Sequence, residues 1–133
     1  ADGIGDTLRV SLTADVVEEV RAGRELLRIF GLDTRGGVEV ISCPTCGRTK
    51  IDLISLANQV EERLRAVKKN ITVAVMGCVV NGPGEMADAD YGYVGAGRGK
   101  VSLYRGKECV LKNIPQEEAV KQLLSLIEAD KKA

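Results

Sequence analysis

The sequence predicts an α/β domain in which helices flank a mixed sheet. Segments with strand-like and helix-like patterns alternate along the first two thirds of the 133 residues, which is typical of parallel strands joined by helices. Short strands separated by glycine-rich turns fill the last third, as in antiparallel hairpins. A composition of 44% hydrophobic and 29% charged residues is that of an ordinary globular domain. The length suits one compact domain.

The N-terminal part is predicted to form a strand and then a helix. Residues 8–12 alternate apolar and polar side chains with the period of a strand. A helix capped by Thr13 or Asp15 is expected to follow and to end at Gly31. Its apolar residues recur at helical spacing: Val16, Val20, Leu27 and Phe30.

The middle of the chain is predicted to alternate strand, helix and strand. The first strand, residues 38–41, leads into a Cys-Pro-Thr-Cys-Gly loop, and a helix runs from about residue 51 to residue 67. The apolar strand 71–76 is expected to lie at the centre of the sheet, buried on both faces. A loop over residues 77–85 follows it.

The last third is predicted to form a hairpin meander and a helix. Strands 91–94 and 101–104 flank the glycine-rich turn 95–99, and a tight turn leads into a strand over residues 108–111. The final helix is expected to begin at Pro115, since proline is favoured in the first turn of a helix.

Composition and charge exclude several classes of function. Nineteen basic and nineteen acidic residues give no net charge, and one Phe, three Tyr and no Trp leave little to stack on bases, so no nucleic-acid partner is expected. The absence of histidine excludes histidine-based metal sites and catalytic pairs within this chain. No apolar run spans a bilayer and no signal-peptide pattern is present, so we expect a cytoplasmic protein without a membrane partner.

Three of the four cysteines lie in loops that follow predicted strands. Cys43 and Cys46 come after the strand 38–41, and Cys78 comes after the strand 71–76. Because neighbouring parallel strands end at the same edge of a sheet, we expect these three thiols to converge. In a reducing compartment such cysteines indicate metal or redox chemistry. Cys109 alternates within a strand and is expected to be a buried free cysteine.

The residues alone leave several kinds of chemistry open. A thioredoxin-like dithiol would use Cys43 and Cys46 and leave Cys78 unused. Structural zinc normally has four ligands and would require Cys109 as well. An iron–sulfur cluster would suit the glycine-rich loops, because their backbone N–H groups can approach the sulfur atoms. Its fourth ligand would be Glu85 in a catalytic site, or Cys109 in an electron-transfer module.

Three motifs resemble one known family. They are Cys-Pro-Thr-Cys-Gly-Arg at residues 43–48, Gly-Cys-Val-Val-Asn-Gly-Pro-Gly-Glu at residues 77–85, and Gly-Ile-Gly-Asp-Thr-Leu-Arg-Val-Ser-Leu-Thr at residues 3–13. The first two are similar to the C-terminal part of the 4-hydroxy-3-methylbut-2-en-1-yl diphosphate synthases, iron–sulfur enzymes of the non-mevalonate isoprenoid pathway, and the third is similar to the segment just before that part. The similarity extends over essentially the whole chain.

The resemblance implies a domain organisation. Family members have an N-terminal TIM-like barrel and a C-terminal domain that resembles the cluster-binding repeats of sulfite and nitrite reductases. Residues 1–33 would then be the terminal strand and helix of an otherwise absent barrel, and residues 34–133 the iron–sulfur domain. The active site forms in a homodimer, between the barrel of one subunit and the cluster domain of the other, so this chain alone is expected to have little or no activity.

The resemblance also implies a chemistry. Cys43, Cys46 and Cys78 would hold a 4Fe–4S cluster, and Glu85 would ligate the fourth iron until substrate displaces it. Asn81 would lie near the substrate, so that Glu85 and Asn81 are the expected catalytic residues. The reaction is the two-electron reductive ring opening and dehydration of 2-C-methyl-D-erythritol 2,4-cyclodiphosphate to 4-hydroxy-3-methylbut-2-enyl diphosphate. Ferredoxin or flavodoxin would donate the electrons.

Overall fold

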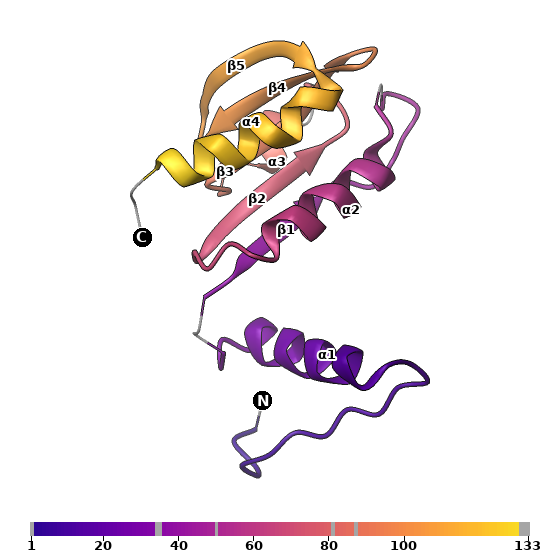
Figure 1. Ribbon diagram of the computed structural model, residues 1–133, viewed down its shortest axis with the longest axis vertical. Helices are drawn as coiled ribbons and strands as arrows, with labels where there is room; N and C mark the ends of the chain where they lie inside the picture. The colour runs from indigo at the N-terminus through magenta and orange to yellow at the C-terminus, as the bar shows by residue number, and fades with distance from the viewer. Residues whose placement is uncertain (1, 34–35, 50, 81, 87, 131–133) are drawn as a thin grey trace. The chain divides into compact units, whose positions relative to one another are not determined.

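The structure is a computed structural model that describes the chain except for residues 1, 34–35, 50, 81, 87 and 131–133 (Figure 1). It divides into two compact units, residues 1–36 and residues 37–133, which are taken here one at a time. Within the described ranges, no helix is both long enough and apolar enough to cross a lipid bilayer.

The first unit contains one helix, α1 (Val16–Ile29). The Asp15 carboxylate caps it by accepting a hydrogen bond from the Val17 N–H at 2.8 Å, as one of the two expected capping residues. The strand expected over residues 8–12 is wrong, since these residues have no regular strand structure. The physical reason is that a strand needs a hydrogen-bonded neighbour, and the described residues of this unit offer none. Instead the Leu12 N–H donates to the Glu19 carboxylate at 3.0 Å.

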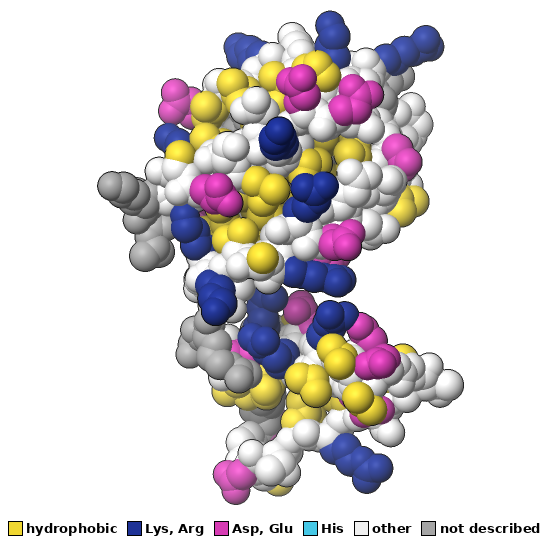
Figure 2. Space-filling view, viewed as in Figure 1, with side chains coloured by type: hydrophobic (Ala, Val, Ile, Leu, Met, Phe, Trp, Pro, Cys, Tyr) yellow, Lys and Arg dark blue, Asp and Glu magenta, His cyan; other side chains and the backbone are white. Residues whose placement is uncertain are grey.

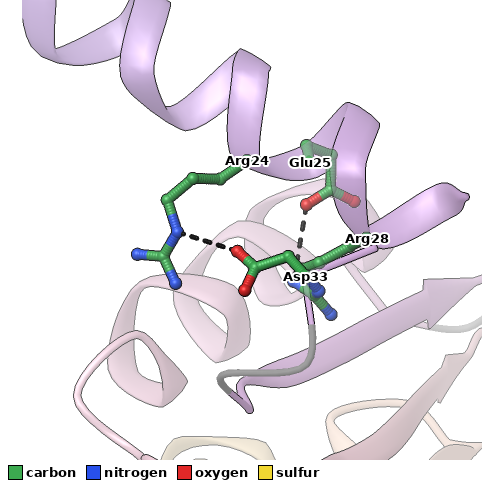
Figure 3. A network of polar contacts seen from close by, with 4 residues as sticks. All are labelled: Arg24, Glu25, Arg28 and Asp33. Carbon is green, nitrogen blue, oxygen red and sulfur yellow. Dashed lines mark hydrogen bonds and ion pairs between the residues drawn. The ribbon is translucent and has the colours of Figure 1, made fainter. Parts of the chain in front are cut away.

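Helix α1 carries apolar side chains that its own unit leaves exposed. None of its residues is buried, and the Val16 and Val20 side chains keep 71% and 63% of their accessible surface. Figure 2 shows hydrophobic side chains gathered on the surface of this unit. Polar contacts tie the helix to the segment after it, because the Arg24 side chain donates to the Asp33 carboxylate at 3.3 Å (Figure 3). The predicted helix is therefore present, while its apolar side chains stay largely uncovered within the unit.

The second unit is built on a mixed five-stranded sheet with the strand order β1-β2-β3-β4-β5. Strands β1 (Val38–Ser42), β2 (Ile71–Met76) and β3 (Tyr91–Gly97) run parallel to one another. Strands β4 (Lys100–Arg105) and β5 (Glu108–Pro115) continue the sheet as an antiparallel meander. The predicted α/β class with a mixed sheet is confirmed.

Two helices cover one face of this sheet. Helix α2 (Leu53–Leu64) connects β1 to β2, and helix α4 (Gln116–Ala129) follows β5 and lies along the same face (Figure 1). Their apolar faces pack on the sheet in the main core, whose fully buried members include Val60, Val73, Tyr93, Leu123 and Ile127. Helix α4 begins at Gln116 with Pro115 as its N-cap, one position after the helix start that the sequence indicates.

A smaller core lies on the other face of the sheet. It joins Ala74 and Met76 of β2 and Val94 of β3 to Met86 and Ala89, which follow the short helix α3 (Gly82–Glu85). Strand β2 is thus buried on both faces at its C-terminal end, as its apolar sequence predicts. This second core holds the end of β2 in place, and the loop with Cys78 begins there.

Candidate functional site

The first two strands deliver their cysteines to one edge of the sheet. In the parallel register Ser42 of β1 lies opposite Val75 of β2, so the residues after each strand become neighbours. The Cys43 N–H extends the ladder by donating to the Val75 carbonyl at 3.3 Å. The Gly77 N–H in turn donates to the Cys43 sulfur at 3.3 Å. The predicted approach of the two cysteine-bearing loops is therefore present.

A tight turn fixes the second cysteine of the Cys-x-x-Cys segment. The Thr49 N–H donates to the Cys46 carbonyl at 3.0 Å, and the Cys46 N–H donates to the Thr49 hydroxyl at 3.3 Å. This reciprocal pair closes the segment into a compact turn. Sequence reasoning did not identify Thr49, although a hydroxyl residue three positions after Cys46 is typical of such side-chain-to-backbone turns.

All three loop cysteines line one cavity of about 140 Å³. Cys43 and Cys78 are half-buried and Cys46 is exposed, and all of them are free thiols. The other lining residues are Pro44, Arg48, Thr49, Met76 and Gly82. The cavity therefore combines three thiols with the cationic side chain of Arg48, and it is open to solvent.

The described residues form no metal-ligand group. Among them, no three Cys, Asp or Glu side chains lie close enough together to hold one metal ion. Asn81 and the side chain of Glu85 lie outside the described residues, and only the backbone of Glu85 is placed, at the end of α3. The structure thus brings the three cysteines to one cavity and leaves the predicted roles of Asn81 and Glu85 untested.

Arg48 lowers the pKa of the Cys46 thiol for a clear physical reason. Its backbone N–H and its cationic guanidinium favour the ionised form of the Cys46 sulfur, the backbone N–H most strongly. Together with Thr49 these groups lower the pKa of Cys46 below the ordinary thiol value of 9.0. The thiolate is the form that binds metals and acts as a nucleophile, so the turn prepares Cys46 for either chemistry.

Cys109 lies elsewhere, on the sheet itself. It pairs with Tyr104 across β4 and β5, is half-buried, and its thiol donates weakly to the Leu111 carbonyl at 3.6 Å. It does not line the cavity of the other three cysteines. The expected free cysteine within a strand is confirmed, although it is less buried than predicted.

Comparison with known proteins identifies the family. A model of the GcpE protein C-terminal domain matches residues 39–129, which include both cysteine loops and the whole sheet from β2 to β5. The chain belongs to this family. The matched range includes the two cysteine motifs that carry the resemblance found in the sequence.

Individual relatives agree with the family model. The chain is 56% identical to a protein of Clostridium perfringens over 96% of its own length, 57% identical to one of Caldanaerobacter subterraneus over 95%, and 52% identical to one of Geobacter sulfurreducens over 96%. Each of them is named 4-hydroxy-3-methylbut-2-en-1-yl diphosphate synthase (flavodoxin). These matches cover 36%, 35% and 35% of the respective relatives, so the chain spans about a third of their length.

Proposed function

We propose that this GcpE C-terminal domain binds a 4Fe–4S cluster through Cys43, Cys46 and Cys78 and serves as the cluster-bearing part of a 4-hydroxy-3-methylbut-2-en-1-yl diphosphate synthase. The observation that carries the proposal is the meeting of these three thiols, from two separate strand ends, around one cavity. The name shared by the relatives supports the assignment of the enzyme.

The chemistry of the donor set fits such a cluster. Iron–sulfur clusters are held by cysteine thiolates whose sulfur atoms accept backbone hydrogen bonds, and the Gly77 N–H already donates to Cys43. The lowered pKa of Cys46 increases the share of its thiolate form. Metal binding contributes free energy to the ordering of its ligands, so we expect the two loops to draw closer when the cluster binds.

The protein's own residues would then manage substrate and protons. When bound, the cluster supplies electrons and a Lewis-acid iron. We assign Glu85 to the fourth ligand position until substrate binds, and afterwards to proton transfer at the departing oxygen. Asn81 is assigned to the substrate pocket beside it. Ring opening of 2-C-methyl-D-erythritol 2,4-cyclodiphosphate to 4-hydroxy-3-methylbut-2-enyl diphosphate takes up two electrons and two protons and releases one water.

Further components complete the proposal. Flavodoxin is the proposed electron donor, in line with the names of the relatives, and ferredoxin is the alternative. The N-terminal barrel of a second subunit in a homodimer is assigned the binding of the diphosphate, since the 133 residues have no net positive charge. We therefore infer that these 133 residues alone hold the cluster but do not turn over substrate. We also propose that the protein acts in the cytoplasm.

The position of Cys109 argues against both alternative functions. An all-cysteine electron-transfer centre or a four-thiolate zinc site would require Cys109 as a ligand, yet Cys109 lies on β5 and does not line the cavity. The test is a set of single serine variants reconstituted anaerobically with iron and sulfide. Serine at position 43, 46 or 78 should abolish stable iron binding, whereas Cys109→Ser should retain the iron content of the parent chain. Loss of iron in Cys109→Ser would favour an alternative.

A further inference from the structure

The loop that carries Cys78 packs closely against the Thr49 side chain and against strand β3 at Gly95. A Cβ atom added to Gly77 would lie 2.7 Å from the Thr49 hydroxyl oxygen and 2.9 Å from the Thr49 methyl carbon. A Cβ atom added to Gly95 would overlap the Gly77 carbonyl oxygen and lie 3.0 Å from the carbonyl carbon. Real Cβ atoms essentially never come this close to another heavy atom. Both glycines are buried, so the three residues form a close-packed column, the Thr49–Gly77–Gly95 stack.

The three members of the stack belong to different parts of the site. Thr49 closes the turn that contains Cys46. Gly77 directly precedes Cys78, and its N–H donates to the Cys43 sulfur. Gly95 lies on β3, where it pairs with Val101 of β4 inside the sheet. The stack therefore connects all three loop cysteines to a paired strand of the sheet.

We propose that the Thr49–Gly77–Gly95 stack sets the distance between the Cys78 thiol and the Cys43 thiol, which makes Gly77 and Gly95 positioning residues of the cysteine site. Absence of a side chain at both positions lets the Gly77 peptide pass between Thr49 and β3. The consequence for cluster binding rests on the proposed function, whereas the spacing of the thiols does not.

A methyl group at position 95 would act on the thiols through the backbone. Its nearest neighbour is the peptide of Gly77, which is less able to move aside than the Ile51 side chain 3.2 Å away. Thr49 also leaves Gly77 little room, since a Cβ atom on Gly77 would lie 2.7 Å from the Thr49 hydroxyl oxygen. The peptide would have to shift along the loop, carrying Cys78 with it and straining the hydrogen bond from the Gly77 N–H to Cys43.

The chain offers a matched control two residues further along the same strand. Gly97 also lies on β3, and a Cβ atom there would meet nothing within 4 Å. Its φ is outside the left-handed region, so alanine fits its backbone. Gly95→Ala and Gly97→Ala therefore add the same methyl group to one strand. Only the methyl group at position 95 would collide with the Gly77 peptide.

The first experiment measures thiol spacing without any metal. In the 133-residue chain with Cys46→Ser and Cys109→Ser, dibromobimane cross-links Cys43 to Cys78 when both thiols are within its short reach, and monobromobimane reports the reactivity of each thiol alone. We expect Gly95→Ala to lower the cross-linking rate roughly tenfold at unchanged single-thiol reactivity, because reactions between held groups fall steeply with ångström-scale displacement. Gly97→Ala should cross-link like the parent. Equal rates in Gly95→Ala and the parent would overturn the proposal, as would an equal loss in Gly97→Ala.

A second pair of variants keeps the test decisive if Gly95→Ala does not fold, as judged by circular dichroism. Gly77→Ala should also lose cross-linking. Adding Thr49→Gly to Gly77→Ala should restore it, because the second change removes the Thr49 side-chain atoms that lie within 3.2 Å of the methyl group of the new alanine. Failure of Thr49→Gly to restore cross-linking would contradict the stack.

Iron uptake separates this inference from the proposed function. A parent chain that binds no iron refutes the cluster proposal while the cross-linking comparison still decides the role of the stack.

Discussion

The N–H of Gly77 donates a hydrogen bond to the sulfur of Cys43 across 3.3 Å, joining residues 34 positions apart in the sequence. The contact follows from the parallel register of β1 and β2, which brings the two strand ends side by side. It places a backbone donor on a thiol of the candidate site. Backbone donors of this kind are what iron–sulfur sites use to stabilise charge on their sulfur atoms.

We predict that Arg48 controls the acidity of Cys46. In the metal-free chain, peptide-resolved alkylation with iodoacetamide should give Cys46 a midpoint below pH 9.0, because the Arg48 backbone N–H, its guanidinium and Thr49 all stabilise the thiolate. Arg48→Ala should raise the midpoint only in part, since the backbone N–H, which is the largest contribution, remains. Alkylation of Cys46 near pH 7.5 should then be slower.

The control for this prediction is Arg98→Ala, which removes an exposed arginine from the turn between β3 and β4. It changes the net charge of the chain equally but should leave the midpoint of Cys46 where it was. An unchanged midpoint in Arg48→Ala, or an equal rise in both variants, would contradict the assignment.

We predict that the 37–133 unit loses stability between about pH 10 and pH 12. Burial raises the pKa of Tyr93 to about 12, and burial together with the Asp130 carboxylate raises the pKa of Tyr91 to about 12. An unfolded tyrosine titrates near pH 10, so above that pH the unfolded chain binds fewer protons than the folded one. The contribution of these two tyrosines to the free energy of unfolding should therefore be level below about pH 10 and fall as pH rises to about 12. Urea titrations across this range measure it.

Replacing each tyrosine by phenylalanine separates its contribution. Among the described residues, the Tyr93 hydroxyl is buried with no hydrogen-bond partner, so Tyr93→Phe should leave the stability at pH 7 unchanged or raise it. Tyr91→Phe should lower it by about 1 kcal/mol, because the Tyr91 hydroxyl donates to Asp130 at 2.9 Å. Both variants should weaken the alkaline fall. A strong loss at pH 7 in Tyr93→Phe would show that its hydroxyl has an important partner.

We predict that Lys69 anchors the end of α4. Its ammonium donates to the backbone carbonyls of Ile127 and Asp130, the latter at 2.6 Å, where the helix leaves carbonyl groups without partners of its own. Lys69→Met should lower the free energy of unfolding by about 1–2 kcal/mol. Lys68→Met, which changes an exposed lysine next to it, should have little effect. Tyrosine fluorescence in urea reports this unit, because all three tyrosines lie in it, and equal stability of the two variants would refute the anchor.

We predict that Glu85 is needed for turnover and not for holding the cluster. In the full-length synthase, Glu85→Gln should keep the iron content and visible absorbance while lowering kcat by roughly a hundredfold or more, as expected when a proton-transfer group is lost. Glu61→Gln, on the exposed side of α2, is the matched control and should retain full activity. Normal turnover in Glu85→Gln would remove Glu85 from the mechanism.

The sequence predicts best where local pattern and burial agree. The apolar run of β2 indicates a central strand, and both cores confirm it. The approach of the cysteine loops could be predicted in the same way, because strand ends at one sheet edge follow from the alternation of strands and helices.

The parts that could not be predicted depend on neighbours. Residues 8–12 have the period of a strand, but a strand forms only beside a partner, and no local pattern reveals whether the partner is present. Helix α3 was not predicted, because its sequence Gly-Pro-Gly-Glu is typical of a turn and indicated a loop. The Thr49–Gly77–Gly95 stack joins three segments distant in sequence, so only the folded chain reveals why positions 77 and 95 exclude a side chain.

The most direct test of the central claim is metal and sulfide analysis of the chain, purified anaerobically or reconstituted with iron and sulfide, together with electron paramagnetic resonance after reduction. The account predicts about four irons and four sulfides per chain and the spectrum of a reduced 4Fe–4S cluster, retained in Cys109→Ser and lost when Cys43, Cys46 or Cys78 is replaced by serine. Stoichiometric zinc without sulfide, or a chain that binds no metal and forms a Cys43–Cys46 disulfide reversibly, would contradict it.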